Sequence, residues 1–537
     1  MAKSLGQIIR SKRPDGTRLA AGFLVMSVIS ALAASAIGAT LVSGLEKGLG
    51  SGFTGIYPAA FFTLEQAALS TLLSAAFAVP VALALESLPR FAGRRALLAL
   101  FAVPLALPAI AVVLGLVTLY GRNGLIADGL AMAGLPLRPD IYGLTGILIA
   151  HVFFNMPLTV RLLLKAFEEI PQEQWKLGES LGFGASGRIR HILWPVMRQS
   201  LPGTCGLVFL LCAGSYTIIL VLGGGPSTTT LQVAIQQALS FDFDPAKASL
   251  LTLAQLALTG LVLAVIPKGQ SLFQTGGVST RRFHQAGAGE MALSVVAIAT
   301  GALFVLSPLL AIASTGVRAD HGRIIGSRLF GQAMTTSLAI AVGSACLATV
   351  GAYAVAAMRY ALASNGHQDW ADAAGKLTTA LLGIPALLLG VGWFVLLAMT
   401  GRPFALAPMM IILANALMAL PFALQMMSTA VDRHFATDDR LSAALGLQGW
   451  SRFAIVDWPV LRGPLAGAFL FAAALSLGDL GVVTLYGSDR IVTLPSLIYQ
   501  NLGSYRSNDA GALVLYLTLL TGALTLLGTR SRSNERT

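Results

Sequence analysis

The chain has 537 residues, of which 55% are hydrophobic and only 11% are charged, and its formal net charge is +12. An ordinary soluble domain carries about 25% charged residues, so a soluble fold of this composition would lack the polar side chains to cover its surface. These values exclude an ordinary soluble protein, and the basic surplus indicates contact with anionic lipid rather than with nucleic acid.

Apolar runs long enough to cross a hydrocarbon core of roughly 30 Å as helices recur along the whole chain. We predict twelve of them, near residues 20–42, 62–86, 97–120, 142–165, 201–222, 248–267, 291–316, 332–357, 377–399, 406–428, 464–486 and 511–528. The first run follows Arg10, Lys12 and Arg13 but is too long for a secretory signal, so we expect it to be retained. The predicted fold class is an all-α polytopic membrane protein.

The basic residues predict the orientation of these helices. If the N-terminus is cytoplasmic, most of the 36 arginine and lysine residues fall in loops on the cytoplasmic side, as the positive-inside rule requires. Both termini are therefore predicted to be cytoplasmic.

The cysteines and histidines predict neither a disulfide nor a metal site. The three cysteines all lie in predicted membrane helices, and the six histidines form no cluster at ligand spacing. We expect no metal, no cofactor and no catalytic residue.

The second half of the chain repeats the first. A shift of 264 residues places Gly182 on Gly446, Arg188 on Arg452, and Trp194-Pro195 on Trp458-Pro459. Upstream, Gln66-Ala67 is matched to Gln332-Ala333 and Pro108-Ala109 to Pro385-Ala386. The predicted organisation is a six-helix half over 1–270, a cytoplasmic linker over 271–290 and a second six-helix half over 291–537. Because each half has an even number of helices, both halves enter the membrane from the same side. They are therefore expected to be related by an axis along the membrane normal.

Each half carries a polar, glycine-containing loop after its fourth helix, at about 168–200 and about 432–464. Six of twenty positions are identical between KLGESLGFGASGRIRHILWP (176–195) and RLSAALGLQGWSRFAIVDWP (440–459), whereas the neighbouring loops differ in length and sequence. Apolar and polar residues alternate at helical spacing, which predicts short helices lying along the cytoplasmic membrane surface. An ordinary interfacial connection is the alternative reading, but it would not need the repeated glycine and Trp-Pro.

These loops resemble the EAA loop of ABC-importer permeases, in which Glu-Ala-Ala, a glycine and a closing Ile-x-Leu-Pro recur. Gly182 and Gly446 fall on the glycine, and Pro195 and Pro459 on the proline, while Lys176 and Arg440 replace the glutamate and Trp194 and Trp458 the leucine. Fused two-half permeases of this kind serve thiamine or ferric iron. LYGRNG (119–124), LGGGPSTTTLQVAIQQALSFDFDPAKA (222–248) and TLPSLIYQNLGSYRSNDAGA (493–512) resemble the thiamine type.

The resemblance implies a bacterial inner-membrane importer subunit that works with a homodimer of ATPase subunits and a periplasmic binding protein. The implied cargo is thiamine or its phosphates. The loops would couple to the ATPase, and the residues expected to take part are Lys176, Glu179, Leu181, Gly182, Trp194, Pro195, Arg440, Leu445, Gly446, Trp458 and Pro459. The glycines would form tight turns, the tryptophans would anchor in lipid headgroups, and the prolines would start the following helix.

The cargo path has fewer candidates. Asp479 falls in the predicted eleventh helix, where an ionisable residue is costly and marks a functional candidate. Its counterpart is Ser215, followed by Tyr216, which could offer a cation–π contact to a cationic cargo. The alternative is that Asp479 pairs with an arginine or caps a broken helix. For His151 and Asn155, one turn apart in the fourth helix, we expect hydrogen bonds between helices.

Other functional classes fit less well. The chain has no GxxxxGK[ST] phosphate-binding motif, so the energy for transport must come from a partner. The GxGxxG spacing of 182–187 follows no predicted strand, which argues against a dinucleotide site. A major-facilitator transporter also has two six-helix halves but no duplicated loop after the fourth helix. A membrane enzyme would need a nucleophile, a carboxylate pair or a metal cluster, and none is evident.

Overall fold

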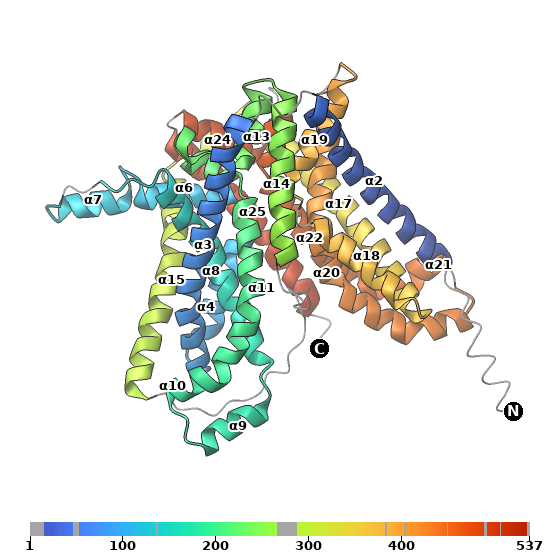
Figure 1. Cartoon of the computed structure of the whole chain (residues 1–537), viewed down its shortest axis with the longest axis horizontal. Helices are drawn as coiled ribbons and strands as arrows, with labels where there is room; N and C mark the ends of the chain where they lie inside the picture. Colours follow the sequence, from blue (N-terminus) through green and yellow to red (C-terminus); the bar gives the residue numbers. More distant parts are fainter. Residues whose placement is uncertain are drawn as a thin grey trace. The chain divides into compact units, whose positions relative to one another are not determined.

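The computed structural model describes residues 16–46, 53–135, 138–265, 287–381, 384–401, 404, 406–447, 449–487, 491–504 and 506–533. Helices make up most of this part of the chain, and no strand occurs among these residues. The fold is thus all-α, as the composition predicts (Figure 1).

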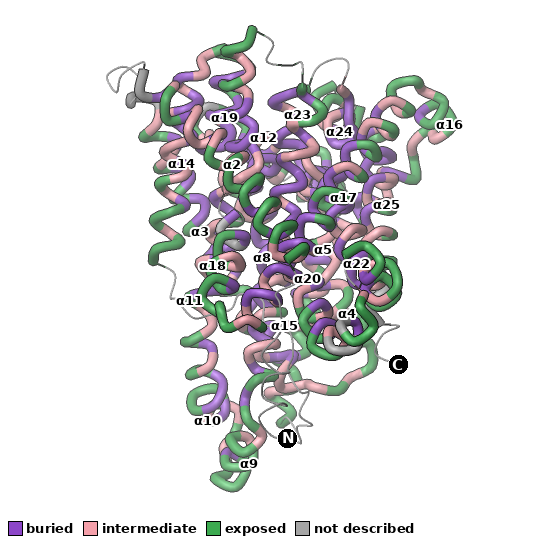
Figure 2. The backbone as a smooth tube through the Cα atoms, turned by 90° about the vertical axis from the view of Figure 1, so that its right-hand side faces the viewer, coloured by how far each residue is buried: buried purple, intermediate pink, exposed green. Residues whose placement is uncertain are grey.

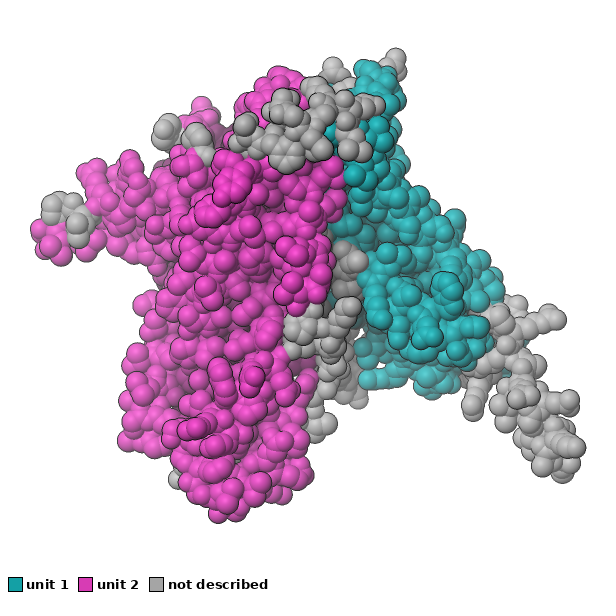
Figure 3. Space-filling view, viewed as in Figure 1, with its two compact units in different colours: residues 1–47, 327–496, 519–537 teal, residues 48–326, 497–518 magenta. Residues whose placement is uncertain are grey.

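The chain divides into two compact units, coloured separately in Figure 3. Unit 1 comprises residues 1–47, 327–496 and 519–537, and unit 2 comprises residues 48–326 and 497–518. The helices lying wholly within unit 1 are α2 (Gly16–Glu46), α17 (Arg328–Ser364), α18 (Gln368–Ala380), α19 (Ala386–Ala398), α20 (Ala407–Ala444), α21 (Gly449–Arg452), η4 (Phe453–Asp457), α22 (Trp458–Leu477) and α23 (Gly481–Tyr486).

Unit 2 contains the corresponding helices of the first half together with two from the second, α15 and α16. They are α3 (Phe53–Ser87), α4 (Arg94–Leu100), α5 (Val103–Ala106), α6 (Ala109–Tyr120), α7 (Leu125–Met132), α8 (Leu144–Glu168), α9 (Gln172–Ser180), α10 (Ala185–Arg188), η1 (Ile189–Leu193), α11 (Trp194–Ala213), α12 (Thr217–Leu222), η2 (Pro226–Thr228), α13 (Leu231–Ser240), α14 (Pro245–Val265), α15 (Ala288–Val317) and α16 (His321–Ile325). Two helices, α24 (Leu494–Gly503) and α25 (Ser507–Ser533), include residues of both units.

All twelve predicted membrane helices correspond to helical segments. In the described part of the chain, eleven are long and apolar enough to cross a membrane, and the ninth predicted run contains the shorter apolar helix α19. The protein is therefore a polytopic helical membrane protein.

Four of the twelve are interrupted, and the interruptions occur at equivalent places in the two halves. Pro108 and Pro385 precede the main helices of the third and ninth spans, α6 and α19. The fifth and eleventh spans break after Gly214 and Gly478, so that α12 and α23 follow as separate short helices. A helix that ends inside a membrane leaves backbone N–H and C=O groups that need hydrogen-bond partners within the protein or in a cavity. These breaks are therefore candidates for a functional site.

The helix bounds confirm the duplication. The elements α10, η1, α11 and α12 begin and end 264 residues before α21, η4, α22 and α23. The same offset that aligns the sequence therefore aligns the local structure, including a π-helical turn in each half.

The match of Gln66-Ala67 to Gln332-Ala333 is wrong. The helices that contain these residues, α3 and α17, start 275 residues apart and end 277 apart. The Thr63 hydroxyl accepts the backbone N–H of Leu231, and the Ser337 hydroxyl accepts that of Leu494, which pairs Thr63 with Ser337. The identical dipeptide is therefore out of register by about two helical turns.

The first helix of each half packs with helices of the other half. In unit 1, α2 contacts α17 and α19, and in unit 2, α15 contacts α3 and α6. Small residues permit the close approach, since a Cβ added at Gly392 in α19 would lie 2.2 Å from the backbone oxygen of Ala36 in α2. Each compact unit thus contains the first helix of one sequence half together with later helices of the other half.

The buried side chains follow the interhelical faces of each unit. In unit 1 one core cluster joins α17, α20 and α22 around Met358, Met427 and Phe435. Many apolar side chains on the outer faces, such as Leu24 and Leu293, are exposed, as expected where lipid covers a helix. Figure 2 shows this alternation of buried and exposed residues along the long helices.

Candidate functional site

The first polar loop forms a short helix followed by a longer helical run. Helix α8 ends at Glu168, Pro171 precedes α9, and α10, η1 and α11 then follow without interruption. In Figure 1, α9 lies beyond the ends of the long helices of unit 2. The loop therefore projects from the unit, as the sequence predicts.

Gly182 forms the tight turn that ends α9. Its φ is +68°, the N–H of Gly182 donates to the oxygen of Glu179, and the N–H of Phe183 donates to the oxygen of Gly178. This pair of bonds is a Schellman motif, which satisfies the last carbonyls of a helix and needs a left-handed residue. Glycine is favoured there because it has no Cβ to oppose a positive φ.

A different glycine makes the close approach within the loop. A Cβ added at Gly182 would meet no atom within 4 Å, whereas one added at Gly178 would lie 2.8 Å from Cδ1 of Ile192. Gly178 thus lets α9 pack against η1, and it is a residue that the sequence analysis missed. The surface beside Gly182 is open.

The second loop reproduces the turn but not the break before it. Gly446 has a φ of +66°, and the N–H of Leu447 donates to the oxygen of Ser442, which is the corresponding bond of the same motif. The preceding helix, however, is a single α20 that continues from the fourth membrane helix of its half to Ala444. Position 435, which matches Pro171, is a phenylalanine, so nothing interrupts the helix there.

The predicted coupling residues are exposed wherever their side chains are described. These are Lys176, Glu179, Leu181, Gly182, Trp194, Pro195, Leu445, Gly446, Trp458 and Pro459, while the side chain of Arg440 lies outside the described part. Leu181, which follows α9, is 61% exposed, and Leu445, which follows α20, is 64% exposed. The structure thus presents an apolar residue immediately before each glycine.

Two further exposed apolar residues belong to the same surfaces. Leu177 is 59% exposed one helical turn before Leu181, and Trp450 is 78% exposed in α21. The i, i+4 spacing of the two leucines was visible in the sequence and would have identified Leu177. No repeat partner marks Trp450, because the matching residue is Ser186.

Pro195 and Pro459 lie in the first turns of α11 and α22, where the sequence places them. The π-helical turns η1 and η4 lead into those helices without a break, so the prolines continue a helical run. The N–H of Trp194 donates to the oxygen of Ile189, five residues back, as does that of Trp458 to Phe453. A wider π-turn thus carries the helix past a residue that has no N–H to donate. Both tryptophans are about half exposed.

The candidates for the cargo path lie at the breaks in the fifth helix of each half. Ser215 and Tyr216 precede α12, and Tyr216 is buried. Asp479 precedes α23, and its Oδ1 accepts the N–H of Gly481 at 3.2 Å. Gly481 is the first residue of α23, so this contact is compatible with the alternative that Asp479 caps a broken helix. Both roles of Asp479 stay predictions.

His151 and Asn155 make the hydrogen bonds between helices that we expect. Nδ1 of His151 lies 2.9 Å from the Ser70 hydroxyl in α3, and the Asn155 amide donates to Sγ of Cys212 in α11 at 3.3 Å. Asn415, which matches His151, donates to Ser476 in α22. These polar residues join the helices within each unit.

Comparison with known proteins agrees with this architecture. Residues 76–268 match the family described as binding-protein-dependent transport system inner membrane component. The thiamine transport system permease protein ThiP of Brucella abortus (strain 2308) is 45% identical over 97% of this chain and 96% of its own length. That of Escherichia coli (strain K12) is 39% identical over 86% of both chains, and that of Haemophilus influenzae (strain ATCC 51907 / DSM 11121 / KW20 / Rd) is 35% identical over 94% of both.

Two repeated six-helix halves, each with an exposed loop after its fourth helix, define an inner-membrane permease subunit of a binding-protein-dependent importer. The chain belongs to the family of thiamine transport system permeases, which it matches over nearly its full length. Membership of this family implies an ATPase partner and a substrate-binding protein, and it does not favour the ferric-iron and major-facilitator alternatives.

Proposed function

We propose that this chain imports thiamine or its phosphates across the bacterial inner membrane, driven by a partner homodimer of ATPase subunits. The family membership and the 45% identity to a thiamine permease support the cargo. The paired exposed loops, each ending in a Schellman turn at the same repeat position, support the coupling role. The chain itself is a transport subunit and takes its energy from the partner.

Each loop would contact one ATPase subunit. Leu181 and Leu445 offer apolar side chains beside glycines that leave room for a partner backbone. Closure of the ATPase dimer can move the permease only if the loops contact the two ATPase states differently, because coupling is a difference in interaction free energy. Trp194 and Trp458 would contact lipid headgroups beside the loops.

The proposal also includes the predicted topology and organisation. Both termini and the linker within 271–290 are cytoplasmic, and the six-helix halves 1–270 and 291–537 are the repeating units. Residues 288–290 of that linker already belong to α15, while 266–286 lie outside the described residues. The basic residues of the cytoplasmic face would contact anionic lipid.

For the cargo path, we infer that Asp479 and Tyr216 act at the breaks in the two fifth helices. A carboxylate attracts the thiazolium cation of thiamine, and an aromatic ring binds a cation through its face. Ser215 would contribute a hydroxyl beside Tyr216. The broken helices support this, since irregular backbone inside a membrane is tolerated where it lines a cavity or is buried in protein.

Reconstitution tests the function directly. The chain, the ATPase and the binding protein are placed in vesicles, and uptake of labelled thiamine, thiamine diphosphate and ferric iron is measured with and without ATP. We expect ATP-dependent uptake of a thiamine compound. Uptake of iron alone, or thiamine uptake that continues without the ATPase, would contradict the proposal.

A further inference from the structure

Each of the two polar loops, which we call the coupling loops, contains a buried arginine. A buried side chain cannot contact an ATPase, so the proposed coupling does not explain its charge. Arg188 and Arg452 occupy the same repeat position, as the last residues of α10 and α21. They are only 9% and 6% exposed. A buried guanidinium is costly unless it is paired and hydrogen-bonded, so the partners of these two residues indicate what the charge is for.

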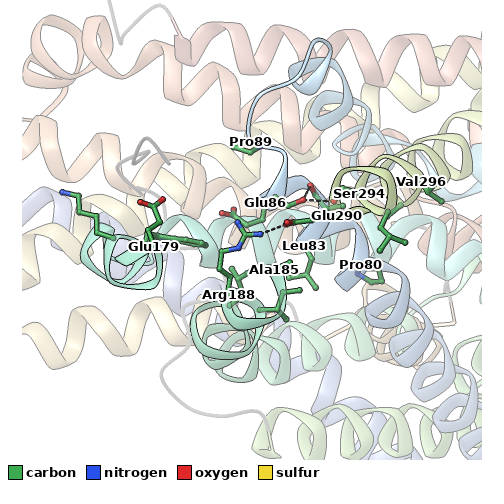
Figure 4. Close-up of a pocket in the computed structure, with 18 of the residues that line it drawn as sticks. Pro80, Leu83, Glu86, Pro89, Glu179, Ala185, Arg188, Glu290, Ser294 and Val296 are labelled. Carbon is green, nitrogen blue, oxygen red and sulfur yellow. Dashed lines mark hydrogen bonds and ion pairs between the residues drawn. The ribbon is translucent and has the colours of Figure 1, made fainter. Parts of the chain in front are cut away.

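Arg188 pairs with the first helix of the second half. Its Nη2 lies 2.5 Å from Oε1 of Glu290, in the first turn of α15, and both side chains are less than a fifth exposed. The pair lines a cavity of about 660 Å³, together with residues of α3, α9 and α15. Figure 4 shows the two labelled side chains joined by a dashed line among the other lining residues. Beside it, the hydroxyls of Ser87 and Ser294 lie 2.7 Å apart.

Arg452 reaches the first helix of the first half through an acidic residue. Asp439 accepts hydrogen bonds from Arg452 and from Arg18, which lies in the first turn of α2. Arg18 is held further by Phe435, since its guanidinium carbon lies 3.7 Å from the centre of that ring. Asp457 also contacts Arg452, at 3.5 Å.

In both units, ion pairs connect the loop arginine to the first membrane helix of the other sequence half, and we call each connection a link. The residue on that first helix has opposite charge in the two links. In unit 2 the helix α15 supplies the carboxylate that receives the loop arginine directly. In unit 1 the helix α2 supplies an arginine, and Asp439 lies between two cations. The same two elements, loop and first helix, are therefore joined in each unit by different residue types.

We propose that Arg188 and Arg452 are positioning residues that fasten each coupling loop to the first membrane helix of the opposite sequence half. This inference rests on the proposed coupling role of the loops. Arg188 and Glu290 both lie in unit 2, and Arg452, Asp439 and Arg18 all lie in unit 1. Each link therefore makes a loop and the membrane helices of its own compact unit move together when the loop is moved.

A charge exchange tests the first link. Arg188→Glu, Glu290→Arg and the double variant are each prepared in complex with the ATPase and the binding protein, and thiamine uptake per ATP hydrolysed is measured in vesicles. We expect each single variant to lower this ratio by roughly tenfold, which corresponds to about 1.4 kcal/mol of coupling free energy. The double variant should recover most of the loss.

Matched controls separate the charge pair from general packing damage. Ser294→Ala removes the neighbouring hydrogen bond between α3 and α15 without changing a charge, and it should leave the ratio unchanged. Glu290→Gln keeps the shape of the side chain and serves if a charge reversal prevents membrane accumulation. In the second link, Asp439→Asn should lower the ratio in the same way, since it removes the negative charge that Arg18 and Arg452 share.

The outcomes are distinguishable from failure of the proposed function. If the unaltered complex takes up no thiamine compound or does not hold the ATPase, the proposed function is wrong. If it works and Arg188→Glu, Glu290→Gln and Asp439→Asn all keep a normal ratio, the link has no role in coupling. Loss of ATPase association in the single variants, or a double variant as impaired as the singles, would also overturn the inference.

Discussion

Replacement of the turn glycines separates the shape of the loops from their contact with a partner. Gly182 and Gly446 have φ values of +68° and +66°, and an added Cβ would meet no atom of the chain within 4 Å. For an alanine at either position, any loss beyond backbone strain must therefore come from something outside the chain. The useful series at each position is Asn, Ala and Trp.

The magnitudes differ across this series. A left-handed conformation costs most residues roughly 1–2 kcal/mol and asparagine less, so Ala should weaken the turn and Asn should nearly preserve it. Trp pays the same strain and adds bulk where the ATPase is expected to approach. If that bulk removes about 3 kcal/mol of differential contact, coupling falls by more than about a hundredfold, since each 1.4 kcal/mol is a factor of ten.

The assay is membrane abundance, ATPase co-purification and cargo-stimulated ATP hydrolysis for each variant. We expect normal abundance throughout, because neither glycine packs against another part of the chain, and loss of association or stimulation in Gly182→Trp and Gly446→Trp. We expect the two variants to differ in severity, since only the first loop has a break before it. Full association and full stimulated hydrolysis in both Trp variants would show that the loops are mere connections.

Three further predictions concern the cargo path, the topology and the loop packing. Asp479→Asn should weaken uptake of a cationic vitamin while abundance and ATPase association stay normal, and unchanged uptake kinetics would leave Asp479 with only its capping contact. Ser279→Cys, in the linker outside the described residues, should resist an impermeant thiol reagent added to intact cells, and rapid labelling would refute a cytoplasmic linker. Gly178→Leu should weaken the packing of α9 on η1 by roughly 1–3 kcal/mol, because a Cβ at this position meets Ile192. Faster proteolysis between α9 and η1 would report this loss. Gly184→Ala is the control and should behave as the parent chain, because its added Cβ meets no atom within 4 Å.

The sequence was sufficient for the membrane helices because hydropathy directly reflects the environment that each helix must enter. Length, apolar composition and the repeat at offset 264 predicted the twelve runs and the equivalence of the two loops. The same signal could not show that the third and ninth spans are interrupted at Pro108 and Pro385, because a proline is compatible with either a kinked or a broken helix. It also left helix ends open by several residues.

The candidate site was predicted in part. The exposed glycine turns followed from glycine between amphipathic segments, but the buried Arg188 and Arg452 could not be recognised as paired, since their partners lie 102 and 13 residues away along the chain. The exchange of first helices was equally hidden, because hydropathy reports that a helix is in the membrane and not which neighbour it packs against. Tertiary contacts decide both features.

The proline before α9 has a mechanical consequence. At Pro171 a bend separates the first loop from its membrane helix. In the second half, α20 is a single helix of 38 residues that ends at Ala444, directly before the turn at Gly446. A displacement at the end of a continuous helix is transmitted along the helix axis. A displacement of α9 can instead be taken up by rotation at the bend before it. The same displacement applied to both loops would therefore be transmitted more directly to the membrane helices of the second loop than to those of the first.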